Sequence, residues 1–337
     1  MPRRQWISLN DVALWDNVCR AAYQAARGKR SRPDVKAFFT DFSQTIPRVQ
    51  YAIRSARLVD GVYRSFIIRD PKVREIHAVS FPDRVLHHAL INCIGGRMER
   101  SWVDSSYACR TGKGAHRAII KAQHYCQHYP FVIKMDVSSY FSTVNHAILM
   151  RLLHRIFKGE HFFTLLENIL SSFSSEVGLP IGALTSQYFA NHYLDGFQRF
   201  LKQQKGVCAE LRYMDDCLVW VRDQCTARQV VKRAEEWLVV QRAISLKPSI
   251  IQRTRIGLSF CGFKINHDGI WMGKRRKRRY RHFLKTALKA AQYGGVTHLS
   301  LQAQTACLRS LCLPGDHGAW QRGVWEGLTD VLRQIEV

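Results

Sequence analysis

The chain has 337 residues, of which 46% are hydrophobic, and its formal net charge is +25. This length predicts two or three packed lobes rather than one core, and the apolar content excludes a disordered chain. No apolar run approaches the roughly 20 residues that span a bilayer, and residues 1–15 lack the apolar centre of a signal peptide. We therefore expect a cytoplasmic protein with no membrane partner.

The ten cysteines and fourteen histidines are scattered along the chain, without paired CxxC or His-x-x-x-His spacings. This predicts reduced thiols and argues against a zinc site or a disulfide framework. The net charge exceeds what solubility requires and predicts a polyanionic partner, with nucleic acid as the first candidate. An anionic membrane surface and a ribosome are the alternatives, but neither requires the carboxylates described below.

The first part of the chain reads as helices, then a hairpin, then more helix. Residues 1–60 have helical apolar spacing, interrupted by a basic loop at 28–33. Residues 62–81 predict two strands joined at Asp70-Pro71, and this hairpin carries basic side chains. An amphipathic helix is predicted over 83–100, followed by a glycine-and-basic loop that leads into another helix.

The second part predicts an antiparallel sheet backed by helices. Its apolar runs and turn signals alternate in the order strand, helix, glycine-bearing turn and helix, hairpin, helix and hairpin. A basic segment with helical spacing follows. The predicted elements lie at 131–136, 144–156, 177–201, 210–221, 227–243, 258–272 and 273–293.

Three carboxylates stand out among these elements. Asp215 and Asp216 lie together at the tip of the hairpin in 210–221, and Asp136 ends the strand at 131–136. Adjacent carboxylates are costly unless a cation lies beside them, and oxygen ligands are those that Mg²⁺ prefers. A single aspartate is more often a turn residue or helix cap, but the three in this order predict a two-metal phosphoryl-transfer site.

Four segments together resemble a reverse transcriptase, and the resemblance covers nearly the whole chain. It implies an α+β, right-hand polymerase fold with fingers, a palm made of an antiparallel sheet backed by helices, and a helical thumb. The implied divisions are 1–130 for N-terminal helices and fingers, 131–265 for the palm with finger-palm elements at 150–180, and 266–337 for a basic thumb. The segments are FVIKMDVSSYF, GLPIGALTSQYFANHYL, RYMDD and LSFCGFKI.

A subfamily is also implied. Most reverse transcriptases have Gln-Gly and Ser-Pro in the second of these segments, whereas this chain has Ile181-Gly182 and Ser186-Gln187. With residues 69–90 and 104–116, this version is similar to the reverse transcriptases of diversity-generating retroelements, which are bacterial or phage-encoded. One departure is the segment CLPGDHGAW near the C-terminus, where that family has a Trp-Ser-Gly-His-like stretch.

The resemblance assigns the metal site. It implies that Asp136 and Asp215 hold two Mg²⁺ ions, that Asp216 acts electrostatically, and that the backbone carbonyl of Val137 completes a metal shell. All three aspartates are therefore candidate catalytic residues.

The resemblance also implies residues that bind the deoxynucleoside triphosphate. Basic side chains of the 62–81 hairpin would contact its phosphates, and the ring of Phe141 would exclude a ribose hydroxyl. In the second segment, Ile181 would face the base and sugar, and Gln187 would orient the backbone of the segment. A solvated basic strand, a core phenylalanine and a helix-packing isoleucine are the alternatives. The residues are Lys72, Arg74, Phe141, Ile181, Gly182 and Gln187.

Two further groups would bind nucleic acid. The hairpin at 258–272 would grip the primer through Phe260, Cys261 and Gly262. The basic run after it would follow the template–primer backbone, with a solvated helix face or a localisation signal as alternatives. Its basic residues are Lys274, Arg275, Arg276, Lys277, Arg278, Arg279 and Arg281.

The sequence thus predicts an RNA-directed DNA polymerase that copies a template RNA into cDNA. The diversity-generating type further implies errors at template adenines, a structured template RNA with its RNA/cDNA duplex, and an oligomeric basic accessory variability protein. Ile181 supplies a physical reason for low fidelity, because an apolar side chain penalises a mispair less than an amide does. A defence-associated or group II intron-like reverse transcriptase and a non-catalytic RNA-binding scaffold are the alternatives.

Overall fold

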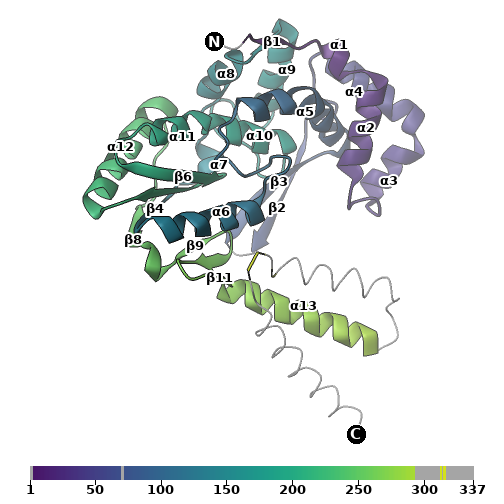
Figure 1. The fold of residues 1–337 in the computed structure, drawn as a ribbon. Coiled ribbons are helices and arrows are strands. Elements are labelled where there is room, and N and C mark those ends of the chain that lie inside the picture. The colour runs from purple at the N-terminus through teal and green to yellow at the C-terminus, as the bar shows by residue number, and fades with distance from the viewer. Residues whose placement is uncertain (1–2, 70–71, 293–311, 313, 316–337) are drawn as a thin grey trace.

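The structure is a computed structural model that describes residues 3–69, 72–292, 312 and 314–315. Helices gather at the N-terminal end, a four-stranded sheet with helices on both faces forms the centre, and a small sheet leads into one long helix (Figure 1). This mixture of helices and antiparallel strands confirms the predicted α+β class. None of the described helices combines the length and apolar character that crossing a bilayer requires.

The N-terminal helices pack around a central helix, α5. A helix over 83–100 is confirmed, but its amphipathic character is wrong, because α5 is buried on nearly all sides. Helices α1 to α4 cover part of its surface and α10 contacts the rest, so apolar residues are needed all round. The elements are β1 (Gln5–Trp6), α1 (Leu9–Val12), α2 (Trp15–Ala26), α3 (Pro33–Thr40), α4 (Phe42–Arg54) and α5 (Phe81–Ser101).

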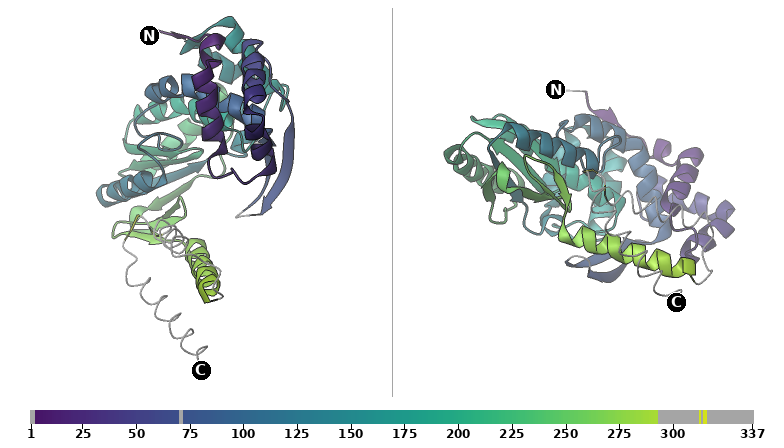
Figure 2. Two further views of the ribbon diagram at one scale, coloured as in Figure 1. Left: turned by 90° about the vertical axis from the view of Figure 1, so that its right-hand side faces the viewer. Right: turned by 60° about the horizontal axis from the view of Figure 1, so that its bottom comes forward.

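The predicted hairpin over 62–81 is confirmed as β2 (Tyr63–Arg69) and β3 (Val73–Val79). The two strands pair antiparallel along their whole length, from Tyr63 opposite Val79 to Arg69 opposite Val73. The hairpin forms one edge of the molecule (Figure 2, left view). Most side chains of the two strands are exposed.

The central sheet has the strand order β6-β7-β4-β8, and every neighbouring pair is antiparallel, as predicted. Its apolar runs bury alternate side chains on opposite faces. In β4, Ile133 and Met135 join the core under α12, whereas Val132 joins the core under α6. The strands are β4 (Phe131–Asp136), β6 (Val207–Tyr213), β7 (Asp216–Val221) and β8 (Ile250–Arg253), and the helices over its two faces are α6 (Ala115–His128) and α12 (Gln224–Arg242).

A helical insertion connects β4 to β6. Helix α10 begins after the glycine-bearing turn of the second family segment, as the sequence predicts, and packs on both α5 and α8. The inserted elements are α7 (Tyr140–Thr143), α8 (His146–His154), β5 (Phe157–Lys158), α9 (Glu160–Ser171), α10 (Leu184–Tyr193) and α11 (Asp195–Lys202).

The segment over 258–272 contains one strand more than the predicted hairpin. After a short turn η1 (Thr254–Ile256), it forms a three-stranded antiparallel sheet of β9 (Leu258–Phe260), β10 (Phe263–Ile265) and β11 (Ile270–Met272). The basic segment that follows is helical, as predicted, and forms α13 (Lys274–Gln292). Most of the proposed thumb lies outside the described residues, including all of CLPGDHGAW except Cys312, Pro314 and Gly315.

Candidate active site

The three aspartates meet at one end of the central sheet. Met214 and Asp215 form the two-residue connection between β6 and β7, and Asp216 is the first residue of β7. Asp136 is the last residue of β4, and the strand register places it directly opposite Asp216. Because β4 and β7 are neighbours, residues distant in sequence become adjacent at this edge.

Two lysines lie against these carboxylates. Lys247 Nζ is 2.8 Å from Asp136 Oδ2, and Lys134 Nζ is 3.2 Å from Asp216 Oδ1. In the part of the chain that the structure describes, no three acidic, histidine or cysteine side chains form a ready-made metal cluster. The lysines thus partly offset the negative charge that the aspartates bring to this edge.

Burial makes Asp215 and Asp216 costly to ionise. It raises the pKa of Asp215, and the charges of Asp136 and Asp216 raise it further, against hydrogen bonding to its own backbone and the charge of Lys247. Burial also raises the pKa of Asp216, against the stabilising charge of Lys134. Such a site favours any additional cation that lets all of its carboxylates remain ionised.

Two of the carboxylate oxygens show that a metal ion fits this chemistry. Oδ1 of Asp136 and Oδ1 of Asp216 are buried and accept no hydrogen bond of acceptable geometry from the described residues, although Lys134 lies close to the second. Buried unsatisfied oxygens cost free energy, and a hard divalent cation takes such oxygens as ligands. The Val137 carbonyl also has no backbone partner among the described residues, because the bridge to Leu246 uses its chain neighbours instead.

The two aromatic residues that follow β4 differ in burial. Tyr140 is buried, and its hydroxyl donates to the carbonyl of Ala190. Phe141 is only half-buried and packs edge-on against Tyr140. Its backbone carbonyl accepts a hydrogen bond from Leu179 at 2.7 Å, which joins Phe141 to the glycine-bearing turn. The structure therefore brings Phe141 and that turn together.

The same turn docks onto the β2–β3 hairpin. The Ile181 carbonyl accepts a hydrogen bond of 2.9 Å from the backbone N–H of His77 in β3. At Gly182, with φ of +126°, an added Cβ would lie 3.1 Å from Ile76 Cγ2 and 3.2 Å from the His77 carbonyl. Glycine is required here both by the backbone angle and by the close approach of β3. Ile181 itself is half-buried.

The remaining predicted nucleotide-binding residues are exposed. Lys72 and Arg74 lie near the tip of the β2–β3 hairpin and have no ion-pair partner among the described residues. Gln187 is exposed on α10, and its Oε1 accepts from the Cys109 thiol at 3.3 Å. Among the described residues, no hydrogen bond joins the Gln187 side chain to the backbone of its own segment. No described contact therefore supports the prediction that Gln187 orients this backbone.

The proposed primer grip is a two-residue turn between β9 and β10. Cys261 and Gly262 both have positive φ, at +47° and +82°, and Phe260 is buried. Lys134, which pairs with Asp216, also donates from Nζ to the Ser259 carbonyl at 3.0 Å. One lysine therefore connects the aspartate-bearing edge of the central sheet to the small sheet.

Helix α13 is only partly a solvated basic face. Arg276 lies 4.3 Å from the centre of the Phe263 ring and donates to the Cys261 carbonyl, and Tyr280 is buried. These contacts dock the start of α13 on the small sheet. Other basic residues of the run are exposed, namely Lys274, Arg275, Arg278, Arg279 and Arg281.

Sequence reasoning missed a basic cavity beside this site. A space of ≈ 840 Å³ lies between the α2–α3 loop, the β2–β3 hairpin and the start of α5, with Gly182 at its wall. Its cations are Lys29, Arg32, Arg64 and Arg84, with Asp34 as the acidic lining residue. Burial and the neighbouring positive charges lower the pKa of both Lys29 and Arg84. The only signal in the sequence was the basic loop at 28–33.

Two curated proteins are similar to the chain in sequence. Protein YkfC of Escherichia coli is 29% identical over 176 residues, which are 46% of this chain and 46% of that protein. The Putative COX1/OXI3 intron 2 protein of Saccharomyces cerevisiae is 26% identical over 108 residues, which are 29% of this chain and 13% of that protein. The match thus spans less than half the length of either relative.

Solved structures of telomerase align with parts of the chain. Telomerase from Candida albicans in complex with a fragment of telomeric RNA has a TM-score of 0.47 and 12% identity, over 65% of this chain and 49% of that one. Apo telomerase from Candida tropicalis, truncated from its C-terminal domain, has a TM-score of 0.48 and 12% identity, over 63% of this chain and 55% of that one.

A family profile matches the part of the chain that holds the aspartates. The family is described as reverse transcriptase (RNA-dependent DNA polymerase), and its profile matches residues 69–265. This stretch is more than half of the 337 residues and runs from the end of β2 to the end of β10. The chain therefore belongs to the reverse transcriptase family.

Proposed function

We propose that this protein is an RNA-directed DNA polymerase whose active site is the sheet edge at Asp136, Asp215 and Asp216. The observation that carries the proposal is the register of Asp136 opposite Asp216, with a buried oxygen on each carboxylate that accepts no hydrogen bond from the described residues, although Lys134 lies 3.2 Å from that of Asp216. Membership of the reverse transcriptase family supports it independently. The relatives extend well beyond the matched part, so the activity is inferred for this chain from its own residues.

Divalent cations fit the proposed site. Asp136 and Asp215, with the Val137 carbonyl, would hold them, and two Mg²⁺ ions are the proposed complement. When bound, such ions activate the primer hydroxyl and neutralise the triphosphate. The chain's own contribution is to fix the carboxylates at the ends of two paired strands and to keep Lys134 and Lys247 beside them as counter-charges.

The incoming nucleotide would lie against the glycine-bearing turn. Phe141 is half-buried and bound to this turn through Leu179, which supports its proposed role as a steric gate beneath the sugar. Ile181 and Gly182 are fixed against β3, which supports a wall for base and sugar. The exposed Lys72 and Arg74 are proposed to contact the triphosphate.

Nucleic acid would bind on the basic surfaces on either side of the site. The exposed cations of α13 are proposed to follow the backbone of the template–primer duplex, next to the primer grip at Phe260, Cys261 and Gly262. The basic cavity beside Gly182 is proposed to receive the single-stranded template RNA before it is copied. Residues 1–130, 131–265 and 266–337 would then act as fingers, palm and thumb.

The finer assignment is a diversity-generating reverse transcriptase, with an oligomeric accessory protein and error-prone copying of template adenines. The residues that support it are Ile181 and Gln187 in the second segment. The similarity to a yeast intron protein favours the second candidate, a group II intron-like enzyme. The two candidates differ in the error spectrum of their cDNA, because only the first makes errors concentrated at adenines.

A primer-extension assay tests the proposed activity. The purified protein, a labelled primer on an RNA template and deoxynucleoside triphosphates should give extension in Mg²⁺. A chelator should abolish extension, and excess Mg²⁺ should restore it. Absence of extension with Mg²⁺ or Mn²⁺ on several RNA templates, by protein that binds those templates, would favour a non-catalytic RNA-binding scaffold.

The proposed role of Ile181 in fidelity can be tested separately. Ile181→Gln adds an amide that rewards correct pairing geometry, and one hydrogen bond of about 0.5–1.5 kcal/mol corresponds to a roughly two- to tenfold lower error rate. Sequencing of cDNA from an adenine-rich template compares the variant with Ile181→Leu, which stays apolar. An unchanged error spectrum in Ile181→Gln would remove this residue from the account of low fidelity.

A further inference from the structure

Arg212 lies beneath the turn that carries Asp215, and its side chain is completely buried. All five N–H donors of its guanidinium have an acceptor. Nη1 donates to the Met214 carbonyl at 2.9 Å and to Asn191 Oδ1 at 3.0 Å. Nη2 donates to the Asn191 carbonyl at 3.0 Å and to Ser106 Oγ at 3.2 Å. Nε donates to Gln198 Oε1 at 2.8 Å.

Every one of these acceptors is neutral. In the part of the chain that the structure describes, no carboxylate oxygen lies within ion-pair distance of the Arg212 side chain. A buried charge without a counter-ion depends on its hydrogen bonds, and removing one of them leaves an expensive unsatisfied group. Burial accordingly lowers the pKa of Arg212. The guanidinium therefore constrains the positions of all the groups that it contacts.

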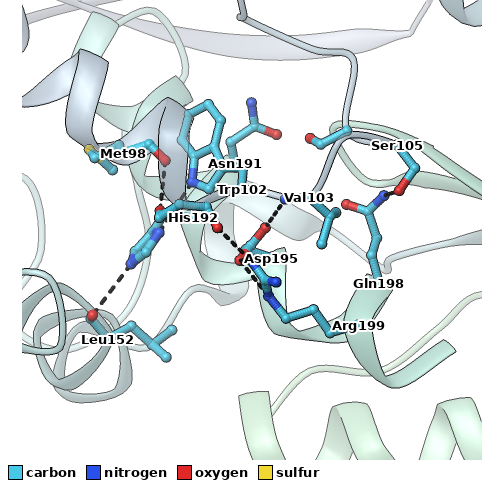
Figure 3. A network of polar contacts seen from close by, with 12 residues as sticks. Met98, Trp102, Val103, Ser105, Leu152, Asn191, His192, Asp195, Gln198 and Arg199 are labelled. Carbon is cyan, nitrogen blue, oxygen red and sulfur yellow. Dashed lines mark hydrogen bonds and ion pairs between the residues drawn. The ribbon is translucent and has the colours of Figure 1, made fainter. Parts of the chain in front are cut away.

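The acceptors are themselves held in place. Figure 3 shows Gln198 beside Ser105, to which its Nε2 donates at 2.9 Å. Ser105 donates in turn to Glu210 Oε1 at 2.6 Å. In the same network Asp195 accepts from the backbone N–H of Val103 at 2.9 Å. These bonds join α10, α11, β6 and the segment after α5 into one rigid support.

The turn needs such a support. Met214 has φ of +56°, in the left-handed region that is costly for a residue with a side chain. Its carbonyl is the acceptor that links the turn to Arg212. The next residue is Asp215, so a rotation of the Met214–Asp215 peptide would move that carboxylate relative to Asp136. The hydrogen bond from Arg212 opposes this rotation.

We propose that Arg212 is a positioning residue, which holds the Met214 carbonyl and so fixes the Asp215 carboxylate at the sheet edge. The expected effect on kcat rests on the proposed polymerase function, whereas the expected effect on the position of the turn does not. The fork geometry of the guanidinium is the essential property, because a single ammonium cannot reach acceptors on four sides at once.

The kinetic test compares two buried arginines. Arg242 is also buried, packs on Trp237 and donates to the Tyr193 carbonyl, but it does not contact the turn. Arg212→Gln should lower kcat for nucleotide incorporation about 30- to 100-fold, the loss expected from a misplacement near 1 Å. Its KM for nucleotide and Kd for primer–template should stay within about threefold, and Arg242→Gln should keep kcat within about threefold of wild type.

Arg212→Lys separates geometry from charge. It keeps the positive charge but should stay at least about tenfold below wild type in kcat, because it restores only part of the hydrogen bonding. Full rescue by lysine would overturn the proposal, since charge alone would then suffice. A kcat of Arg212→Gln equal to that of Arg242→Gln would also overturn it.

Amide hydrogen exchange supplies a readout that does not depend on activity. In Arg212→Gln, the peptide covering residues 207–221 should exchange faster around Met214 and Asp215, while Arg242→Gln leaves this peptide unchanged. If wild type incorporates no nucleotide, the proposed function fails and exchange alone decides the role of Arg212. If Arg212→Gln does not fold, Arg212→Lys carries both measurements. Failure of both to fold, with Arg242→Gln folded, would show a general structural role and overturn the proposal.

Discussion

At the scale of single residues, the site combines groups that are unfavourable alone. Asp136 and Asp216 each bury an oxygen that accepts no hydrogen bond from the described residues, and Met214 adopts a left-handed backbone angle. Such costs persist only where surrounding structure enforces them, and they gather at functional sites. Here the enforcing contacts come from Lys134, Lys247 and Arg212.

A second residue-scale consequence concerns Phe141. Because this ring is half-buried and bound to the glycine-bearing turn, Phe141→Val should open space for a ribose hydroxyl. Incorporation of ribonucleotides relative to deoxynucleotides should rise about tenfold or more, as steric exclusion costs at least about 1.4 kcal/mol. Phe200→Val, at an aromatic ring stacked on Trp237 in the α11–α12 contact, is the matched control. Equal sugar selectivity in both variants would identify Phe141 as a packing residue.

At the scale of elements, α5 buries a titratable group that the proposed chemistry does not use. His87 is buried, and burial, with the charges of His88 and Arg84, lowers its pKa to about 3 from an ordinary value of 6.5. Protonation therefore favours the unfolded state. The contribution of neutral His87 to stability is complete above about pH 6.5 and is lost as the pH falls toward 3.

The pH dependence of unfolding measures this effect. Between pH 6 and 4, His87 should cost wild type up to about 1.4 kcal/mol for each pH unit. His87→Gln cannot titrate, so its free energy of unfolding should fall less steeply over this range. His161→Gln, at an exposed histidine of α9, controls for the loss of any histidine. Parallel pH profiles of wild type and His87→Gln would contradict the assignment.

The elements also show what could be predicted from sequence. Apolar runs in β4 and β7 and the turn between β6 and β7 have local patterns, so the sequence alone locates the three aspartates at the ends of strands. The burial of α5 was missed because it depends on helices distant in sequence. The Arg212 network was missed for the same reason, since Ser106 and Asn191 reach it only through tertiary packing.

At the scale of the molecule, the net charge of +25 is distributed over distinct surfaces. One lies on α13 and another lines the cavity beside Gly182. RNA affinity should therefore fall steeply between about 50 and 200 mM salt, as expected when several phosphates are neutralised. Replacing the exposed Lys274, Arg278 and Arg279 with Gln should make this dependence shallower.

A second variant, which loses the same charge elsewhere, tests whether the cations of α13 affect RNA binding because of where they lie. Lys205, Arg228 and Lys232 are exposed on and near α12, and replacing them with Gln removes the same charge elsewhere. Salt titrations of RNA binding should give a slope shallower by about two to three for the α13 variant and a smaller change for the α12 variant. Equal slopes would show that the nucleic acid follows another surface.

We propose above that the sheet edge at Asp136, Asp215 and Asp216 performs nucleotide transfer. The most direct measurement is the rate of single-nucleotide incorporation by Asp215→Asn, beside Asp16→Asn at an exposed aspartate of α2. Asp215→Asn keeps shape but removes a proposed metal ligand, so its rate should fall at least about a hundredfold, or about 2.7 kcal/mol. Its affinity for RNA should stay within about twofold of wild type. A rate for Asp215→Asn that matches Asp16→Asn would show that this sheet edge does not perform nucleotide transfer.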